Sequence, residues 1–417
     1  MISRRRPYGQ LGTHKGSIKP PIRVHVRSRA PLCPLPLLGP AFLGARFLGA
    51  RLLRGLMIGG LVVGLFVGLA GCAPSYPSVT DCQDEGGIHV ICGLQNPEDL
   101  ALLPGEEQVI LSQFGSMDGT RSGNLALFDI ETEAVRVVFR GGSGAAIGGA
   151  AGVWGDPSCP GPPNASFSPH GIDLAELSGR GLRLLVVNHG GRESVEFFEV
   201  NSSEGGVALT WRGCALAPEQ GYLNDVVSLP GGGFLVTHMM PRDAALWGIV
   251  KSQFGFDTGH VYEWEPGRGF RIAPGTTAPF PNGIEVSADG RRLYLNIYSA
   301  GEVRQIDRQT GEILGSARVP SPDNSTWARD GRLLVASHAG GLSDQIACMG
   351  LEKGACGMEF SIVAVDPLSL KVETLFRQAG PPMGAGTVAL DLGDGELLIG
   401  SFAADRMLRV RLPLAVP

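Results

Sequence analysis

The chain has 417 residues, including 62 glycines and 30 prolines, and a formal net charge of −5 at pH 7. Residues 1–72 hold 11 of the 35 Lys and Arg and no Asp or Glu, so residues 73–417 carry 24 basic and 40 acidic residues, a formal charge of −16. This acidic balance argues against nucleic acid as a partner, because such binding needs a basic surface that neutralises phosphates.

The first 72 residues are typical of a targeting segment. Three arginines precede the apolar run 56–70, which is too short and too rich in glycine for a comfortable membrane span. Leu69-Ala70-Gly71-Cys72 is similar to the bacterial lipoprotein signal, in which the cysteine is lipidated and becomes the mature N-terminus. We therefore expect a lipid anchor at Cys72 and a location in the bacterial cell envelope, on its periplasmic or extracellular face.

Two alternatives remain open for this segment. It could be an uncleaved anchor helix that ends in a chance cysteine. Residues 1–45 could also lie upstream of the true start codon, since a later start would leave a signal of ordinary length.

Residues 73–85 are typical of a linker, and residues 86–417 are predicted to form one domain. Six cysteines follow Cys72, and in an exported chain an even number suggests disulfides, although six cysteines allow fifteen pairings. Local loop closure favours Cys82 with Cys92 and Cys348 with Cys356, which leaves Cys159 for Cys214.

A strand-turn-strand pattern recurs six times along this domain. Its clearest copy begins at 283–286, turns at Asp289-Gly290, and continues through strands at 292–297, 302–307 and 312–319. Four short strands with tight turns indicate a propeller blade, and six blades of about 55 residues fill the available length. A strand at 89–94 could close the ring against the last blade. The sequence therefore predicts an all-β fold, a six-bladed β-propeller.

Two insertions interrupt the regular spacing of the repeats. One is the glycine-rich stretch 141–163, before the second blade, and the other is 239–259, within the third. The second insertion contains Trp247, Ile249, Val250 and Phe254, which could form a short apolar lid helix; a surface loop is the alternative.

A short polar signature stands at the start of each repeat. The six signatures are Pro97-Glu98-Asp99, Pro169-His170-Gly171, Leu223-Asn224-Asp225, Pro281-Asn282-Gly283, Pro322-Asp323-Asn324 and Gly386-Thr387. Equivalent positions of a radially repeated sheet converge on one axis. Five of the six signatures would thus deliver a carboxylate, amide or imidazole to a common point, whereas Thr387 offers no strong ligand.

These side chains suit calcium better than zinc or copper. Two carboxylates and three amides come from Glu98, Asn224, Asn282, Asp323 and Asn324. Calcium takes six to eight oxygen ligands of this mixed kind, and such a set is poor for softer metals. A single Asn before Gly or Asp is more often a turn residue, but recurrence at equivalent repeat positions favours ligands.

The ordered set of motifs resembles the paraoxonases, which are calcium-dependent six-bladed propeller lactonases and arylesterases related to the gluconolactonase and strictosidine-synthase-like propellers. The similarity extends from about Gly93 to Leu412. It is strongest in Pro97-Glu98-Asp99-Leu100, Phe167-Ser168-Pro169-His170-Gly171-Ile172, Leu184-Leu185-Val186-Val187-Asn188-His189, Asn224-Asp225, Pro281-Asn282-Gly283-Ile284 and Asp323-Asn324.

The resemblance implies roles for these residues and two bound calcium ions. A catalytic calcium would be held by Glu98, Asn224, Asn282, Asp323 and Asn324. A buried structural calcium would be held by Asp99, Asp225 and the backbone carbonyl of Ile172. His170 and His189 match the histidine pair proposed to activate water, although a metal-bound carboxylate is the alternative base, and His189 could instead be a buried, hydrogen-bonded histidine.

The chain also departs from the family pattern. The segment after Thr237 is His238-Met239-Met240, so the residues that shape substrate choice do not carry over. No cysteine follows Cys356, so ring closure must depend on strand pairing rather than on a disulfide at the chain's end.

The function expected from these features is calcium-dependent hydrolysis of small-molecule lactones or aryl esters by a lipid-anchored enzyme. Calcium would polarise the substrate carbonyl, and a neutral His170 would accept a proton from the attacking water. Two alternatives are a sugar lactonase of the gluconolactonase type and a non-catalytic propeller, stabilised by calcium, that binds a ligand or partner.

Overall fold

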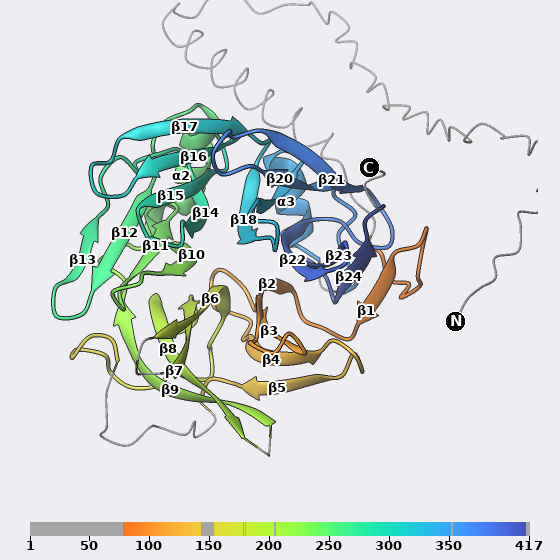
Figure 1. The fold of residues 1–417 in the computed structure, drawn as a ribbon, viewed down its shortest axis with the longest axis horizontal. Coiled ribbons are helices and arrows are strands. Elements are labelled where there is room, and N and C mark those ends of the chain that lie inside the picture. Colours follow the sequence, from red (N-terminus) through yellow and green to blue (C-terminus); the bar gives the residue numbers. More distant parts are fainter. Residues whose placement is uncertain are drawn as a thin grey trace, which may run out of the picture. The chain divides into compact units, whose positions relative to one another are not determined.

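In the computed structural model, six four-stranded antiparallel sheets surround a common axis (Figure 1). The structure describes residues 78–142, 154–177, 179, 181–203, 206–351 and 353–413. The sheets belong to the unit Ala73–Pro417, one of two units into which the chain divides. The predicted six-bladed β-propeller is therefore confirmed, whereas the targeting segment with Cys72 lies outside the described residues.

Five blades are each built from four consecutive strands. They are β2 (Pro97–Leu102), β3 (Gln108–Gln113), β4 (Asn124–Asp129) and β5 (Val135–Phe139); β6 (Pro169–Leu177), β7 (Gly181–Asn188), β8 (Ser194–Ser203) and β9 (Gly206–Leu216); β10 (Leu223–Ser228), β11 (Phe234–His238), β12 (His260–Glu265) and β13 (Gly269–Ile272); β14 (Pro281–Val286), β15 (Arg292–Ile297), β16 (Glu302–Asp307) and β17 (Ile313–Arg318); β18 (Pro322–Trp327), β19 (Leu333–His338), β20 (Phe360–Val365) and β21 (Val372–Gln378).

The sixth blade joins the two ends of the domain. It contains β22 (Gly386–Gly393), β23 (Glu396–Ser401) and β24 (Arg406–Arg411), and its fourth strand is β1 (His89–Cys92). Residues His89 to Cys92 pair antiparallel with Arg409 to Arg406. Strand pairing therefore closes the ring, as the sequence predicted.

The innermost strand of every blade carries the same irregularity. In all six blades, the first signature residue pairs with a residue of the second strand. The pairing register then shifts over the next one or two residues. A bulge of this kind releases residues from the ladder and redirects their side chains. The signature residues are thus the first residues of the inner strands, and their polar side chains are aimed at the ring centre.

The hydrophobic core lies between neighbouring blades. One cluster, for example, packs Ile110 and Leu125 of the first blade against Leu184, Val186 and Phe198 of the second, all fully buried. The second strands of the blades, such as β3, β7 and β19, are almost fully buried and are therefore rich in apolar residues. Burial of these faces fixes the blades against one another and so fixes the positions of the inner strands.

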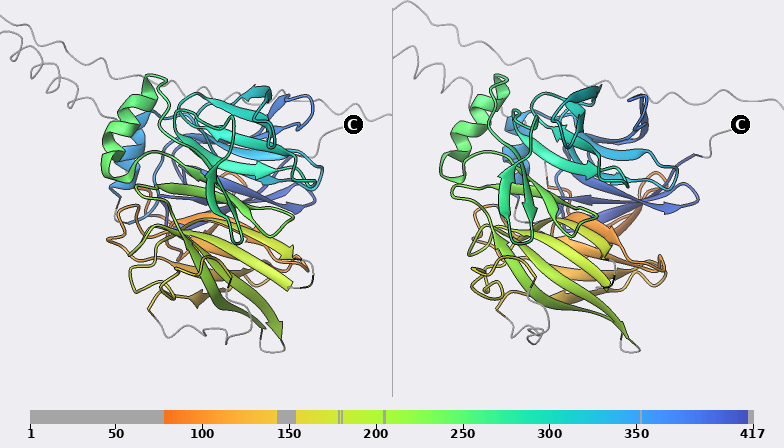
Figure 2. Two further views of the ribbon diagram at one scale, coloured as in Figure 1. Left: turned by 90° about the vertical axis from the view of Figure 1, so that its left-hand side faces the viewer. Right: turned by 60° about the vertical axis from the view of Figure 1, so that its left-hand side comes forward.

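Two α-helices lie at the same end of the ring axis (Figure 2). The helix α2 (Ala245–Gln253), preceded by the 3-10 helix Arg242–Ala244, forms within the second predicted insertion and confirms a short helix there. The helix α3 (Leu342–Met349) was not predicted. Its first turn is capped because Gly341 N donates to Asp344 Oδ2 at 2.7 Å.

Three disulfides join Cys82 to Cys92, Cys159 to Cys214 and Cys348 to Cys356. This is the pairing that local loop closure favoured. Disulfides persist mainly in oxidising compartments, so they indicate a protein located outside the cytoplasm. Among the described residues, no helix is both long and apolar enough to cross a membrane.

Candidate active site

Polar side chains from five inner strands meet at the end of the ring that carries the helices. Glu98, His170, Asn224, Asn282 and Asp323 line one cavity of about 110 Å³, and all are buried. Asn324 joins them because its Nδ2 donates to Glu98 Oε1 at 2.7 Å. The structure thus brings together residues that are up to 226 positions apart in the sequence.

Four oxygen atoms of this cluster have no hydrogen-bond donor among the described residues. They are Glu98 Oε2, Asn224 Oδ1, Asn282 Oδ1 and Asn324 Oδ1, and each is buried. A buried acceptor without a partner costs about 1–3 kcal/mol, so four in one place are unusual unless something else satisfies them. A set of acceptors that consists only of oxygens fits a hard cation such as calcium.

Two amide nitrogens of the cluster already donate hydrogen bonds. Asn324 Nδ2 donates to Glu98, and Asn224 Nδ2 donates to the sulfur of Met239 at 3.4 Å. These contacts leave the amide oxygens as the groups available at the centre. In the described part of the chain, no group of three or more His, Cys, Asp or Glu side chains is arranged to hold a metal ion, so a metal here would depend on amide oxygens.

Electrostatics at the cluster also favour a cation. Burial, followed by repulsion from Glu98, raises the pKa of the Asp323 carboxyl to about 8. A positive counter-charge beside Asp323 would offset this repulsion and favour its ionised form. A metal ion would supply it.

The two carboxylates of the second predicted set, Asp99 and Asp225, follow Glu98 and Asn224 by one residue, and both are buried. Asp99 accepts the N–H of Leu100 at 2.8 Å and of Ile172 at 2.7 Å, and Asp225 accepts those of Val226 and Ile284, both at 2.8 Å. Burial, with repulsion from Glu98 for Asp99 and from Asp99 for Asp225, raises both pKa values well above the usual range. The N–H of Ile172 contacts Asp99, and the role of its carbonyl as a calcium ligand stays a prediction.

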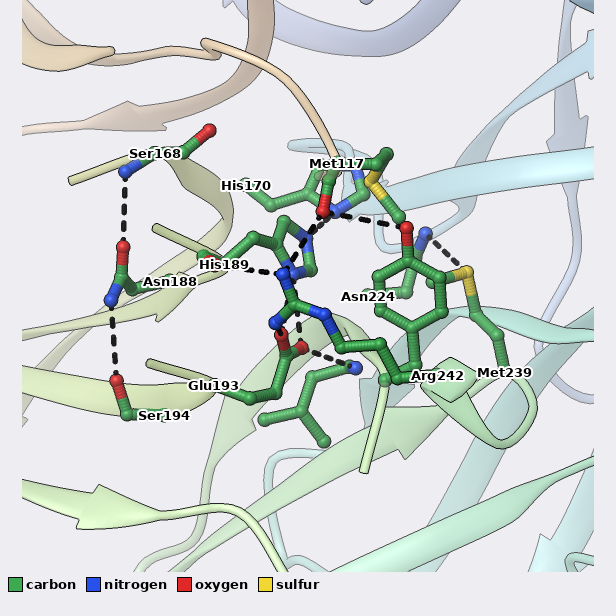
Figure 3. Close-up of polar contacts among 12 residues, drawn as sticks. Met117, Ser168, His170, Asn188, His189, Glu193, Ser194, Asn224, Met239 and Arg242 are labelled. Atoms are coloured by element: carbon green, nitrogen blue, oxygen red, sulfur yellow. Dashed lines mark hydrogen bonds and ion pairs between the residues drawn. The ribbon is translucent and has the colours of Figure 1, made fainter. Parts of the chain in front are cut away.

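The two predicted histidines form a hydrogen-bonded pair (Figure 3). His189 Nε2 lies 3.0 Å from His170 Nδ1, and His170 Nε2 lies 3.4 Å from Glu98 Oε1. The ring of Phe114 stacks on His170 with a centroid distance of 5.1 Å. His170 therefore points one nitrogen at its partner histidine and the other at the oxygen cluster.

Burial and charge act differently on the two rings. Burial opposes protonation of His170, but the carboxylates of Glu98, Asp323 and Asp99 outweigh it and raise the pKa. At His189, burial prevails over the favourable charge of Glu193 and lowers the pKa. His189 is therefore a neutral imidazole near pH 7.

A second ring of residues surrounds the cluster, and only one of its members, His189, is among the residues predicted from the sequence motifs. In each blade, the first signature residue pairs with a residue of the second strand, and the next residue along the chain belongs to this ring. The six residues are Phe114, His189, Met239, Tyr298, His338 and Phe402. Five of them line the central cavity, and His189 contacts it through His170. Their equivalence depends on the pairing register, which the sequence pattern does not show.

His338 lies beside the cluster with a network of its own. Its Nε2 is 2.9 Å from the Gly386 carbonyl and 3.5 Å from Asp323 Oδ2, and its Nδ1 is 3.0 Å from the hydroxyl of Tyr298. Because a carbonyl only accepts, Nε2 carries the proton, and Tyr298 donates to Nδ1. Gln345 of α3 donates to the same hydroxyl. Burial lowers the pKa of His338 to about 4, so this ring is neutral.

The central cavity adjoins a larger one, which is lined by both apolar and polar residues. A cavity of about 490 Å³ shares Phe114, Met117, Met349 and Phe402 with the central one. Tyr222 also lines it. This outer cavity provides room for the apolar part of a small molecule next to the oxygen cluster.

A sequence model described as arylesterase matches residues 86–408. Comparison with curated proteins gives no match.

Solved structures with a similar fold include a gluconolactonase from Xanthomonas campestris, with 16% identity over 82% of this chain and 99% of that one and a TM-score of 0.47. They also include a luciferin-regenerating enzyme, with 15% identity, coverage of 79% and 97% and a TM-score of 0.48. Because the identities and TM-scores are this low, these structural similarities support no inference about function.

Proposed function

Because this chain belongs to the arylesterase family, we propose that it is a calcium-dependent hydrolase of lactones or aryl esters. The observation that carries the calcium part of the proposal is the group of four buried oxygens without donors, from Glu98, Asn224, Asn282 and Asn324. All four residues belong to the set that the sequence motifs single out.

Calcium would be held at the centre by Glu98, Asn224, Asn282, Asp323 and Asn324. Bound there, it would polarise the carbonyl of an ester or lactone and stabilise the negative charge that develops on that oxygen. A second calcium would lie at Asp99, Asp225 and the carbonyl of Ile172, and would stabilise the fold. It would balance the two buried carboxylates whose pKa values are raised.

The protein's own residues would position the substrate and move the proton. The apolar residues that line part of the outer cavity, Phe114, Met117 and Phe402, would hold the aryl or alkyl part. His170 Nε2 faces the oxygen cluster and would accept a proton from the attacking water. Neutralisation of Glu98 and Asp323 by a cation would remove the charges that favour protonated His170 and so free this nitrogen to act as a base.

The proposal is tested by an assay of the purified protein on a panel of lactones and phenyl esters, with calcium and with a chelator. We expect turnover that the chelator abolishes and added calcium restores. In the calcium-loaded protein, His170→Gln should lower kcat by roughly 10²–10⁴-fold, as loss of a general base does. The control is His89→Gln, which changes a half-exposed histidine on the outer strand β1 and should leave kcat unchanged.

The same panel distinguishes the two other candidate functions. Rapid turnover of polar sugar lactones alone would indicate a gluconolactonase-type enzyme. Stabilisation by calcium without turnover of any substrate would indicate a propeller that binds a ligand or partner and has no catalytic role.

We further propose that Cys72 is lipidated and anchors the protein in the cell envelope. The sequence Leu69-Ala70-Gly71-Cys72 and the three disulfides support this location. Metabolic labelling with a fatty acid should mark the wild-type protein in the membrane fraction but not Cys72→Ser. An equal label in the two proteins would contradict the anchor.

A further inference from the structure

Glu193 lies beside the histidine pair and is absent from the sequence-based set of site residues (Figure 3). It stands between β7 and β8, four residues after His189, and its side chain is only 9% exposed. Its Oε1 and Oε2 lie 2.9 and 3.1 Å from His189 Nδ1. The carboxylate thus contacts the ring nitrogen that faces away from His170.

Two further donors hold this carboxylate in place. The backbone N–H of Leu223 donates to Oε1 at 2.7 Å, and Arg242 donates to Oε2. Arg242 also donates to the His189 carbonyl at 3.1 Å. Both partners are donors, which suits a carboxylate because it can only accept hydrogen bonds.

The direction of each hydrogen bond in the chain then follows. Since Glu193 only accepts, His189 must carry its proton on Nδ1, and a neutral His189 has an acceptor at Nε2. His170 must therefore donate from Nδ1 across the 3.0 Å contact. The nitrogen of the pair that remains for exchange with the site is His170 Nε2, 3.4 Å from Glu98 Oε1.

We propose that Glu193 is a positioning residue: its carboxylate sets the tautomers of His189 and His170, so that the basic nitrogen of the pair is His170 Nε2, directed at the oxygen cluster. Without the carboxylate, His189 could carry its proton on Nε2 and donate to His170 Nδ1. His170 would then hold its own proton on Nε2, where a base is needed. This consequence for catalysis rests on the proposed function, whereas the tautomer assignment does not.

Glu196 offers a matched control three residues further along the chain. It too is a buried glutamate held by an arginine: Arg192 donates to it at 2.8 Å, and Trp211 Nε1 donates at 2.9 Å. Within the described part of the chain, its hydrogen bonds are to Arg192, Ser194 and Trp211 and do not involve His170 or His189. Glu196→Gln should therefore report the general cost of replacing a buried carboxylate in this blade.

The experiment compares Glu193→Gln, Glu193→Asp and Glu196→Gln with the wild type in the full, calcium-loaded protein. Steady-state kinetics on the best substrate gives kcat and KM, and ¹⁵N NMR of the histidine rings gives their tautomers. We expect Glu193→Gln to lower kcat about 10–100-fold with KM changed less than about 2-fold, as loss of a residue that orients a histidine does. Glu193→Asp should recover part of kcat, and Glu196→Gln should retain it.

The NMR spectra should show His189 as the Nδ1–H tautomer in the wild type and as a mixture in Glu193→Gln. An unchanged kcat and tautomer in Glu193→Gln would overturn the proposal, as would an equal loss of kcat in Glu196→Gln. If the wild type hydrolysed no substrate, the proposed function would fail, and the tautomer of His189 in the two proteins would still decide the role of Glu193.

Discussion

Asn324 donates a hydrogen bond to Glu98 at 2.7 Å, although 226 residues separate them. The bond links the inner strands β18 and β2 across the centre of the ring and leaves an oxygen of each side chain without a donor. Folding therefore brings together groups that would be better solvated apart, a cost that binding of a ligand can offset.

Calcium should stabilise the folded protein through this cluster. A ligand that binds only the native state adds about 2.7 kcal/mol to the free energy of unfolding at 100 times its Kd. We expect the Tm of the wild type to rise with calcium, and Glu98→Gln to lose most of that rise. Thermal unfolding with calcium or with a chelator measures the change in Tm. The control is Glu312→Gln, which changes an exposed glutamate. A wild-type Tm that does not change with calcium would contradict the metal site.

Tyr298→Phe should destabilise the protein by about 1–3 kcal/mol, because it leaves Nδ1 of the buried His338 without its donor. It also removes the group to which Gln345 donates, so amide exchange in α3 should become faster. Denaturant unfolding and hydrogen exchange measure the two effects.

Tyr294→Phe provides the control for the helix effect. The Tyr294 hydroxyl is also hydrogen-bonded, to the Pro367 carbonyl at 3.2 Å and to Gln305, but neither of these partners belongs to α3. It should cost similar stability and leave exchange in α3 unchanged. Equal exchange rates in α3 for the two variants would show that Tyr298 does not hold the helix.

His238 should make the protein less stable as the pH falls from about 6.5 to about 4. Burial, with repulsion from His260, lowers its pKa from the ordinary 6.5 to about 4. Between these values the unfolded chain binds the proton more tightly, so acidification favours unfolding, by on the order of 3 kcal/mol at 1.36 kcal/mol per unit. His238→Gln should reduce this slope in unfolding experiments from pH 7 to 4.

His89 supplies a comparison of the opposite sign. Hydrogen bonds to Glu133 and Asp84 raise the pKa of His89 in the folded protein. The stability that protonated His89 adds is therefore present below its pKa in the unfolded chain, and it is lost as the pH rises through its pKa in the folded protein. His89→Gln should therefore not flatten the acid side of the profile. An unchanged acid slope in His238→Gln would refute the role assigned to His238.

Gly171→Ala should destabilise the protein by about 1–3 kcal/mol, the usual cost of overpacking. A Cβ at this position would lie 2.6 Å from Asp225 Cα and 2.7 Å from Asp225 Oδ1, and a neighbouring inner strand cannot easily move away. The matched control is Gly231→Ala, where no atom lies within 4 Å of the added carbon. Equal stabilities of the two variants in urea would contradict the close contact between β6 and β10.

Much of the fold was predictable because its signals are local. Tight turns such as Asp289-Gly290 and the alternation of short strands repeat along the chain, so counting repeats gave the number of blades. The polar residue at the second position of each inner strand could be recognised for the same reason. The helix α3 was missed because its eight residues lie between strands and are capped only by Asp344.

The sequence by itself determined the repeated strand unit and the oxygen-rich signatures, since both are written in consecutive residues. Only the tertiary structure decided that His338 and Tyr298 face the same cavity, that Gln345 reaches it from α3, and that Glu193 is hydrogen-bonded to His189. These relationships depend on strand register and on closure of the ring between β1 and β24. Both arise from contacts between residues that are distant in the sequence. Burial of apolar surface between the blades fixes these contacts, and no local sequence pattern encodes them.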